Sequence, residues 1–155
     1  MSDPISLAAA AAGFIGLAGQ LAQGAIKVKE IYTTINNAPR DIADLCTKME
    51  SLRAVLEEVG GQIPQLSQGN INVDTRTLRN VITQCETSRY RVEAHVKRLS
   101  DGFRHNRGAA MKYVFKKKAI QEMSSDLEQC KSSLILARQS IDRYVDALSA
   151  LETCC

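Results

Sequence analysis

The chain opens with a run of uncharged residues, from Pro4 to Ile26, that consists mostly of Ala, Gly, Leu and Ile. Such a run is comparable with the ~20 residues that a helix needs to cross the hydrocarbon core of a bilayer. The whole chain, however, is 24% charged, and the residues after the run are patterned like packed amphipathic helices. The run therefore has two candidate environments, the centre of a helical bundle and the interior of a membrane.

The length and composition of the chain predict a single all-α domain over residues 1–155. A chain of 155 residues can bury a core without disulfides or metals. Hydrophobic residues make up 45% of it, but aromatic residues only 5%, and Trp is absent. An aliphatic core favours helices over a sheet sandwich, and no segment alternates like a strand. We expect a four-helix-bundle-like antiparallel arrangement with a long apolar N-terminal helix.

The first helix is predicted over residues 4–36. Asp3-Pro4 places an N-cap residue before a proline at the first helical position. Up to Gly24 this helix is apolar on all sides, and beyond Gly24 the pattern becomes ordinarily amphipathic. Gly24 is therefore a candidate position for a kink or a break, and Asn36-Asn37 suit the C-terminal cap.

The second helix is predicted over residues 39–60. Gly60-Gly61 would end it, and Pro64 with the polar residues around it predicts a loop over residues 62–73. The apolar residues of this helix recur every three or four positions, as in a helix with one buried face: Ile42, Leu45, Met49, Leu52, Leu56 and Val59.

The third helix is predicted over residues 74–102. Asp74 would cap its start, and Gly102 and Gly108 lie around its end. On its apolar side only Arg89 interrupts the stripe, whose members are Leu78, Ile82, Cys85, Val92, Val96, Leu99 and Phe103.

The fourth helix, predicted over residues 109–153, has the most regular apolar spacing in the chain. If it is continuous, its length is about 65 Å, against about 33 Å for the second helix. We therefore expect a break near residues 116–118 or an overhang. The heptad-like stripe indicates close neighbours in a bundle and consists of Ile120, Met123, Leu127, Cys130, Leu134, Ala137, Ile141, Tyr144, Leu148 and Leu151.

The sequence does not predict an enzyme. His95 and His105 lie among arginines, far from any thiol or carboxylate at the spacing of metal ligands. Gly13, Gly16 and Gly19 lie within the apolar run, with no strand before them and no Lys-Ser or Lys-Thr pair after them, so they do not form a phosphate-binding loop. No Ser or Cys nucleophile is aligned with a base. We expect no catalytic residue, no metal site and no cofactor.

Three cysteines, Cys46, Cys85 and Cys130, occupy apolar positions of the helical patterns. Buried cysteines behave as small apolar side chains, and they stay reduced in the cytosol. We expect these residues to be reduced thiols in the core of a cytosolic protein.

Basic residues are concentrated between Arg89 and Lys118. This segment holds ten basic and two acidic residues, a net charge of +8, and since the whole chain carries +3, the remainder carries −5. Such asymmetry indicates an anionic partner. Roughly four to eight cations suffice to attract an anionic membrane. The residues predicted to bind its lipid head groups are Arg104, Arg107, Lys112, Lys116, Lys117 and Lys118.

Two other interpretations of this basic segment remain open. Its charges would also serve as the solvated face of a soluble bundle. Nucleic acid is disfavoured as the partner, because Met111, Tyr113, Val114 and Phe115 alternate with the cations where polar readers of base edges would be expected.

Three stretches resemble the HeLo-like domain, the fungal N-terminal domain of STAND or NLR-type immune receptors. They are Asp3-Pro4-Ile5-Ser6-Leu7-Ala8, Gly13-Phe14-Ile15-Gly16-Leu17-Ala18-Gly19-Gln20, and residues 39–56. The resemblance implies a programmed-cell-death effector of fungal innate immunity and heterokaryon incompatibility. It also implies an architecture related to the four-helix domain of mixed-lineage kinase domain-like protein and to plant coiled-coil resistance domains. In that family the domain is inert in the cytoplasm until an upstream receptor or an amyloid-signalling partner oligomerises it.

The resemblance further implies that the N-terminal helix inserts into the plasma membrane after oligomerisation. The residues that would enter the lipid are Ile5, Leu7, Phe14, Ile15, Leu17 and Leu21. The uncharged run permits this role, whereas only the resemblance suggests it. The alternative is a helical adaptor or oligomerisation module that binds another protein while its first helix stays in the core.

Overall fold

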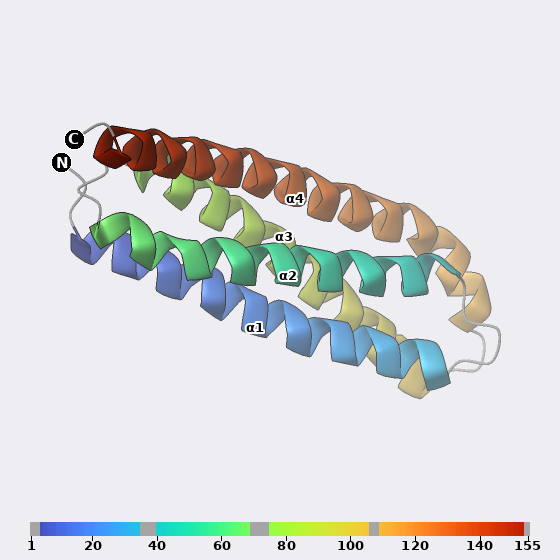
Figure 1. Cartoon of the computed structure of the whole chain (residues 1–155). Helices are drawn as coiled ribbons and strands as arrows, with labels where there is room; N and C mark the ends of the chain where they lie inside the picture. The colour runs from blue at the N-terminus through green and yellow to red at the C-terminus, as the bar shows by residue number, and fades with distance from the viewer. Residues whose placement is uncertain (1–3, 35–39, 69–74, 106–108, 154–155) are drawn as a thin grey trace.

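A computed structural model of the chain describes residues 4–34, 40–68, 75–105 and 109–153. These ranges contain four α-helices and no strand (Figure 1). The predicted all-α fold with a long, apolar first helix is therefore confirmed. The helices are α1 (Pro4–Thr34), α2 (Arg40–Gln68), α3 (Thr75–His105) and α4 (Ala109–Thr153).

Each helix packs against two others, so that the four form a ring in the order α1, α2, α4, α3. Helix α1 lies diagonally opposite α4, and α2 lies diagonally opposite α3. Consecutive helices run antiparallel, whereas the pairs α1 with α3 and α2 with α4 run parallel (Figure 1). The chain consequently passes from one corner of the bundle to the diagonal corner between α2 and α3.

The core is aliphatic, as the composition predicts. All six residues of the predicted α2 stripe are buried, and the α4 stripe is buried from Ile120 to Ile141. Tyr144, which would continue the α4 stripe, is exposed. Phe14 of α1 is the only aromatic side chain in the core among the described residues.

The predicted end of the second helix at Gly60 is wrong, because α2 continues to Gln68. Ile63 and Leu66 extend its buried stripe through the residues predicted to form a loop. Gly60 instead marks a close approach of α1. A Cβ at this position would lie 3.1 Å from Ile15 Cγ1 and 3.2 Å from Phe14 Cβ.

Pro64 lies inside α2 and cannot donate a hydrogen bond to the carbonyl of Gly60. A proline within a helix costs about 3 kcal/mol. Burial of Ile63 and Leu66 offsets this cost, since each fully buried aliphatic side chain contributes about 1.5–3 kcal/mol. Tertiary packing therefore decides the length of α2 against its local signals.

The break considered at Gly24 in the first helix is not found. Helix α1 is continuous through Gly24, where a Cβ would lie 2.7 Å from Met49 Cε, so that this glycine makes room for a side chain of α2. Helix α3 ends at His105, three residues beyond the predicted bound at 102 and between the two glycines expected around its end. Helix α4 has 45 residues without a break at residues 116–118, and it is about 24 Å longer than the 29-residue α2, in agreement with an overhang.

The predicted caps at Asp3, Asn36-Asn37 and Asp74 lie outside the described residues. So does Gly108, which was expected near the end of the third helix.

Candidate functional site

The residues predicted to enter a membrane lie mostly inside the bundle. Leu7, Phe14, Leu17 and Leu21 are buried in the core, with Leu17 only 3% exposed. Ile15, by contrast, is 55% exposed. The side chain of Ile5 lies outside the described part of the chain.

Helix α1 has one buried face and one exposed face that carries mostly small residues. The exposed face includes Ala8, Ala9, Ala12, Gly16 and Gly19. A Cβ added at either of these glycines would meet no atom within 4 Å, so this face is open. The sequence alone could not distinguish the two faces, because both are uncharged.

One stretch of α1 is long and apolar enough to cross a membrane. It covers Leu7–Glu30, 24 residues, and its mean hydropathy is 1.3. About a third of it, 33%, is buried in the bundle. A core helix of a soluble protein meets the same criteria, so this finding concerns length and composition only.

Two of the cations predicted to bind head groups, Lys117 and Lys118, are exposed near the start of α4. Lys117 Nζ lies 3.9 Å from Asp41 Oδ2 of α2, a loose surface ion pair. The side chains of Arg104, Lys112 and Lys116 lie outside the described part of the chain, as does all of Arg107.

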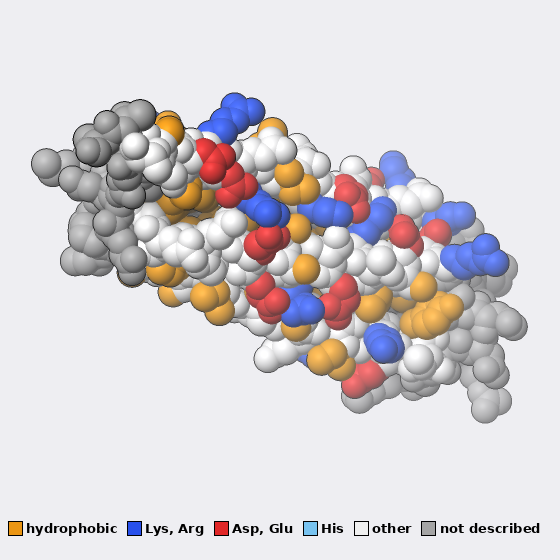
Figure 2. Space-filling model, in the orientation of Figure 1, with side chains coloured by type: hydrophobic (Ala, Val, Ile, Leu, Met, Phe, Trp, Pro, Cys, Tyr) orange, Lys and Arg blue, Asp and Glu red, His pale blue; other side chains and the backbone are white. Residues whose placement is uncertain are grey.

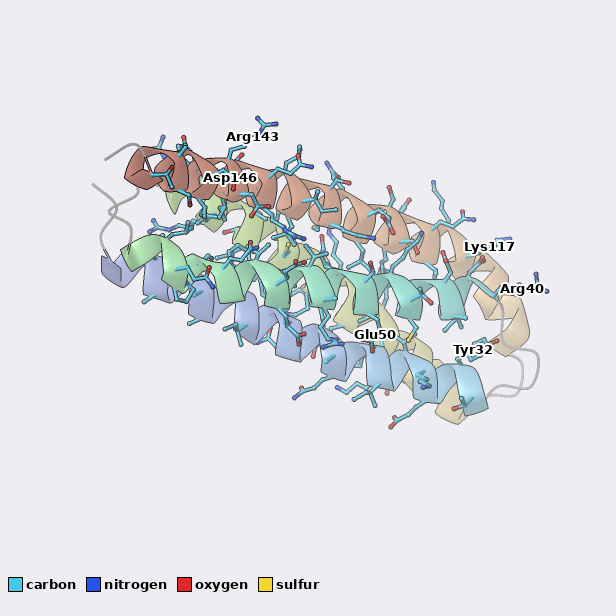
Figure 3. The ribbon with its side chains drawn as sticks, viewed as in Figure 1. Tyr32, Arg40, Glu50, Lys117, Arg143 and Asp146 are labelled. Carbon is cyan, nitrogen blue, oxygen red and sulfur yellow. The ribbon has the colours of Figure 1, made fainter. Side chains whose placement is uncertain are left out.

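Among the members of the two predicted sets whose side chains are described, Lys117 and Lys118 lie apart from the N-terminal part of α1. Lys117 lies at the same end of the bundle as Tyr32 and Arg40, where α1 ends and α2 begins (Figure 3). Helix α1 begins at the opposite end, which is also the end where Asp146 of α4 lies (Figures 1 and 3). Along a helix of 31 residues this separation is about 46 Å.

Ion pairs attach α4 to both of its neighbours. Arg138 Nη1 donates to Glu58 Oε2 of α2 at 2.7 Å, and Arg91 Nη1 of α3 donates to Asp126 Oδ2 at 2.8 Å. Basic and acidic side chains are interspersed over the visible face of the molecule (Figure 2). Exposed pairs of this kind contribute at most about 1 kcal/mol each, so apolar packing holds the bundle together.

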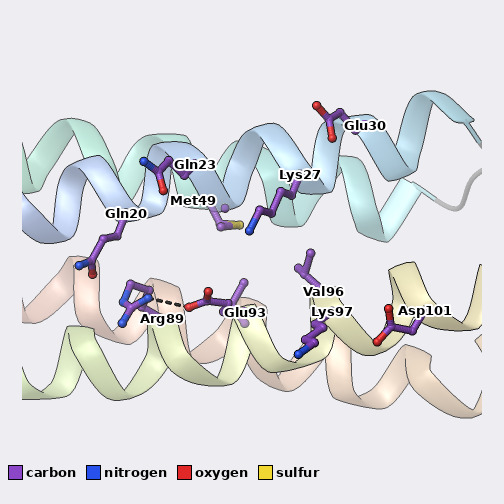
Figure 4. A pocket seen from close by; sticks show the side chains of 12 residues that line it. Gln20, Gln23, Lys27, Glu30, Met49, Arg89, Glu93, Val96, Lys97 and Asp101 are labelled. Carbon is purple, nitrogen blue, oxygen red and sulfur yellow. Dashed lines mark hydrogen bonds and ion pairs between the residues drawn. The ribbon is translucent and has the colours of Figure 1, made fainter.

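A pocket of about 570 Å³ lies between α1 and α3 (Figure 4). Three buried apolar side chains, Met49, Val92 and Val96, form its floor. Polar side chains form its walls, which are Gln20, Gln23, Lys27 and Glu30 on α1, and Arg89, Glu93, Lys97 and Asp101 on α3.

Arg89 is the most constrained polar residue of this pocket. Its side chain is only 13% exposed, and Nη1 donates a hydrogen bond to Glu93 Oε2 at 2.7 Å. The guanidinium lies 4.0 Å from the centre of the Tyr90 ring. Its Nε is buried and has no hydrogen-bond partner among the described residues. A buried donor without a partner costs about 1–3 kcal/mol.

Sequence reasoning missed this pocket, although one signal pointed to it. Arg89 was the only residue to interrupt the apolar stripe of the third helix. The other wall residues lie at ordinary exposed helix positions, and nothing in their spacing distinguishes them.

The cysteines of the described residues are free thiols, with Cys85 and Cys130 buried. A hydrogen bond between these two thiols raises the pKa of Cys85, together with burial, and lowers the pKa of Cys130. Ser88 Oγ lies 3.3 Å from Cys130 Sγ and further lowers that pKa. Burial, as the largest cause, raises the pKa of Cys46, whose Sγ donates to the Ala25 carbonyl of α1 at 3.5 Å.

Among the described residues, no group of three or more His, Cys, Asp or Glu side chains is arranged to hold a metal ion.

No protein-family model, curated protein or solved structure matches the chain.

Proposed function

We propose that the chain is a non-enzymatic effector domain that binds anionic membranes and permeabilises them after oligomerisation. The observation that carries the proposal is the character of α1, a helix long and apolar enough to span a bilayer and only partly covered by the bundle. Its exposed face has no charge before Lys27. The part of α1 before Lys27 has no charged side chain on either face, so lipid as well as the protein core can accommodate it.

The position of the exposed cations supports this proposal. Lys117 lies at the end of the bundle where α1 ends and α2 begins (Figure 3), and Lys118 is the next residue of α4. Cations at a membrane surface contribute about 1 kcal/mol each. Binding through this end keeps the C-terminal end of α1 near the head groups, so that α1 can turn away from the bundle about that end and enter the lipid.

Release of α1 requires an input of free energy. Each large side chain that leaves the core, such as Phe14 or Leu21, loses about 1.5–3 kcal/mol of burial until it reaches lipid. The resting state is therefore the closed bundle in the cytoplasm. Homo-oligomerisation, driven by an upstream receptor or an amyloid-signalling partner in a fungal cell-death pathway, would supply the input and direct the domain to the plasma membrane.

One observation favours the alternative function, a helical adaptor that never leaves its folded state. The buried residues of α1 form a continuous stripe in the core, as in the central helix of a stable bundle. An adaptor would bind a partner helix and ignore lipid.

The decisive experiment places a charge on α1 where it does not disturb the core. Ile15→Glu changes an exposed side chain within the apolar stretch, so the bundle should keep its stability. In lipid, a charge near the centre of a spanning helix costs about 2.5–3.5 kcal/mol. We expect Ile15→Glu to suppress dye leakage from anionic liposomes when the chain is oligomerised through a fused inducible dimerisation tag.

Leu136→Glu is the matched control, because Leu136 is also an exposed aliphatic residue, 65% against 55% for Ile15, and lies on α4. This variant should leak dye as the wild type does. Leu17→Glu is unsuitable alone, since a buried unpaired charge would unfold the bundle. Absence of leakage from the oligomerised wild type would reject the proposal, and binding of a partner helix without lipid binding would establish the adaptor.

A further inference from the structure

We propose that the pocket between α1 and α3 binds a soluble amphiphile that has one alkyl or acyl chain and an anionic head group, either a carboxylate or a phosphate. This inference is independent of membrane permeabilisation, because it concerns a small ligand bound by the closed bundle in solution.

The size and the floor of the pocket suit an alkyl chain. Its volume of about 570 Å³ lies within the roughly 300–1,000 Å³ of ordinary ligand sites. Met49, Val92 and Val96 offer a continuous apolar surface below polar walls. Met49 allows this floor to adapt to ligands of varied shape, because the unbranched side chain of methionine has several accessible rotamers.

The polar walls favour a negative head group. Glu93 is already neutralised by Arg89, and Glu30 and Asp101 each have an interaction partner. Lys27 forms no ion pair within the described part of the chain and points from α1 toward α3 (Figure 4). Lys27 is thus a cation that a ligand in the pocket could engage.

Arg89 supplies the second donor. Its Nε is buried and has no hydrogen-bond partner among the described residues, while Glu93 and Tyr90 contact the rest of the guanidinium. A shift of this lining side chain that exposed Nε to the pocket would let an anionic oxygen accept a charge-assisted hydrogen bond from it. Lys27 and Arg89 come from opposite walls, so one head group that contacts both would bridge α1 and α3.

The absence of Trp from the chain provides a clean reporter. Gln23→Trp places a single indole on the exposed wall of the pocket, and Tyr144→Trp places one on α4, away from it. The probe is dodecyl phosphate below its critical micelle concentration, with inorganic phosphate and dodecyl maltoside as ligands that lack the chain or the charge. We expect a saturable blue shift of the Gln23→Trp emission with dodecyl phosphate alone, and none for Tyr144→Trp.

Variants in the Gln23→Trp background test the assigned donors. Lys27→Gln and Arg89→Gln should each weaken dodecyl phosphate binding roughly tenfold or more, the effect of losing one charge-assisted hydrogen bond. Lys29→Gln removes a charge from the same helix outside the pocket, and it should leave the affinity unchanged.

Equal binding of dodecyl maltoside would overturn the proposal, as would a response to anionic vesicles without one to monomeric dodecyl phosphate. If Arg89→Gln lowers the melting temperature, its effect on binding is not interpretable. The comparison of dodecyl phosphate affinity between Lys27→Gln and Lys29→Gln then tests the site. Equal affinities of these two variants would reject the site.

Discussion

Gly60 and Gly61 are adjacent in α2, yet they have different surroundings. A Cβ on Gly60 would come within 3.2 Å of atoms of Phe14 and Ile15, whereas one on Gly61 would meet nothing within 4 Å. Phe14 Cβ is fixed to the backbone of α1 and cannot move aside without the helix. The spacing between α1 and α2 is therefore set by a residue that has no side chain.

This difference predicts opposite effects of the same substitution at the two positions. Gly61→Ala should raise the free energy of unfolding by up to about 1 kcal/mol through helix propensity. Gly60→Ala gains the same propensity but forces α1 away from α2, and overpacking costs about 1–3 kcal/mol, so the net effect should be destabilising. Urea denaturation of both variants measures this difference. Equal stabilisation by the two alanines would show that α1 does not approach Gly60.

At the scale of the element, helix α2 continues through the pair Gly60-Gly61 and through Pro64. Its local signals end it at Gly60, and its buried residues Ile63 and Leu66 extend it to Gln68. The segment from Gly61 to Gln68 thus depends on the rest of the bundle for its helical state.

Pro64 is exposed, so its replacement tests this segment without disturbing the core. Pro64→Ala restores an N–H donor for the Gly60 carbonyl and should raise the free energy of unfolding by about 1–3 kcal/mol. Gln65→Ala, at the neighbouring exposed position, should change it by less than about 0.5 kcal/mol. Both values come from urea denaturation. No gain from Pro64→Ala would indicate that the helix stops near Gly60 after all.

The existence of the four helices could be predicted because apolar spacing is a local property of the chain. Their ends could not, because α1 continues through Gly24 and α2 through Gly60, and each of these glycines lies close to a side chain of the other helix. The buried face of α1 was equally hidden, since Ile15 and Leu17 look alike in an uncharged run but differ in exposure. The pocket depends on the distance between α1 and α3, for which the interruption of a stripe by Arg89 was the single sign.

At the scale of the whole molecule, the proposed membrane binding assigns the contact with an anionic surface to the end of the bundle that carries Lys117, which Lys118 follows in α4. Replacing both by Gln should weaken binding to anionic vesicles roughly thirtyfold, since each cation contributes about 1 kcal/mol. Vesicle co-sedimentation at fixed salt measures this effect.

A second double variant, Lys131→Gln with Arg143→Gln, serves as the control. It removes the same charge from α4 outside its first turns, and it should change vesicle affinity much less. Similar losses in the two double variants would mean that net charge, rather than one end of the bundle, governs the attraction.

The ring order of the helices has a consequence for any state in which α1 is absent from the bundle. The backbones of α2 and α3 do not approach each other closely within the described residues, so α4 would be the helix that packs directly against both in an open row of three. The surfaces of α2 and α3 that α1 had covered would then be exposed. Gly60, where α1 packs closely against α2, would lie on the exposed surface of α2. This exposed apolar surface would favour association with other chains, because association would bury it again. Departure of α1 and association of chains would thus be a single event.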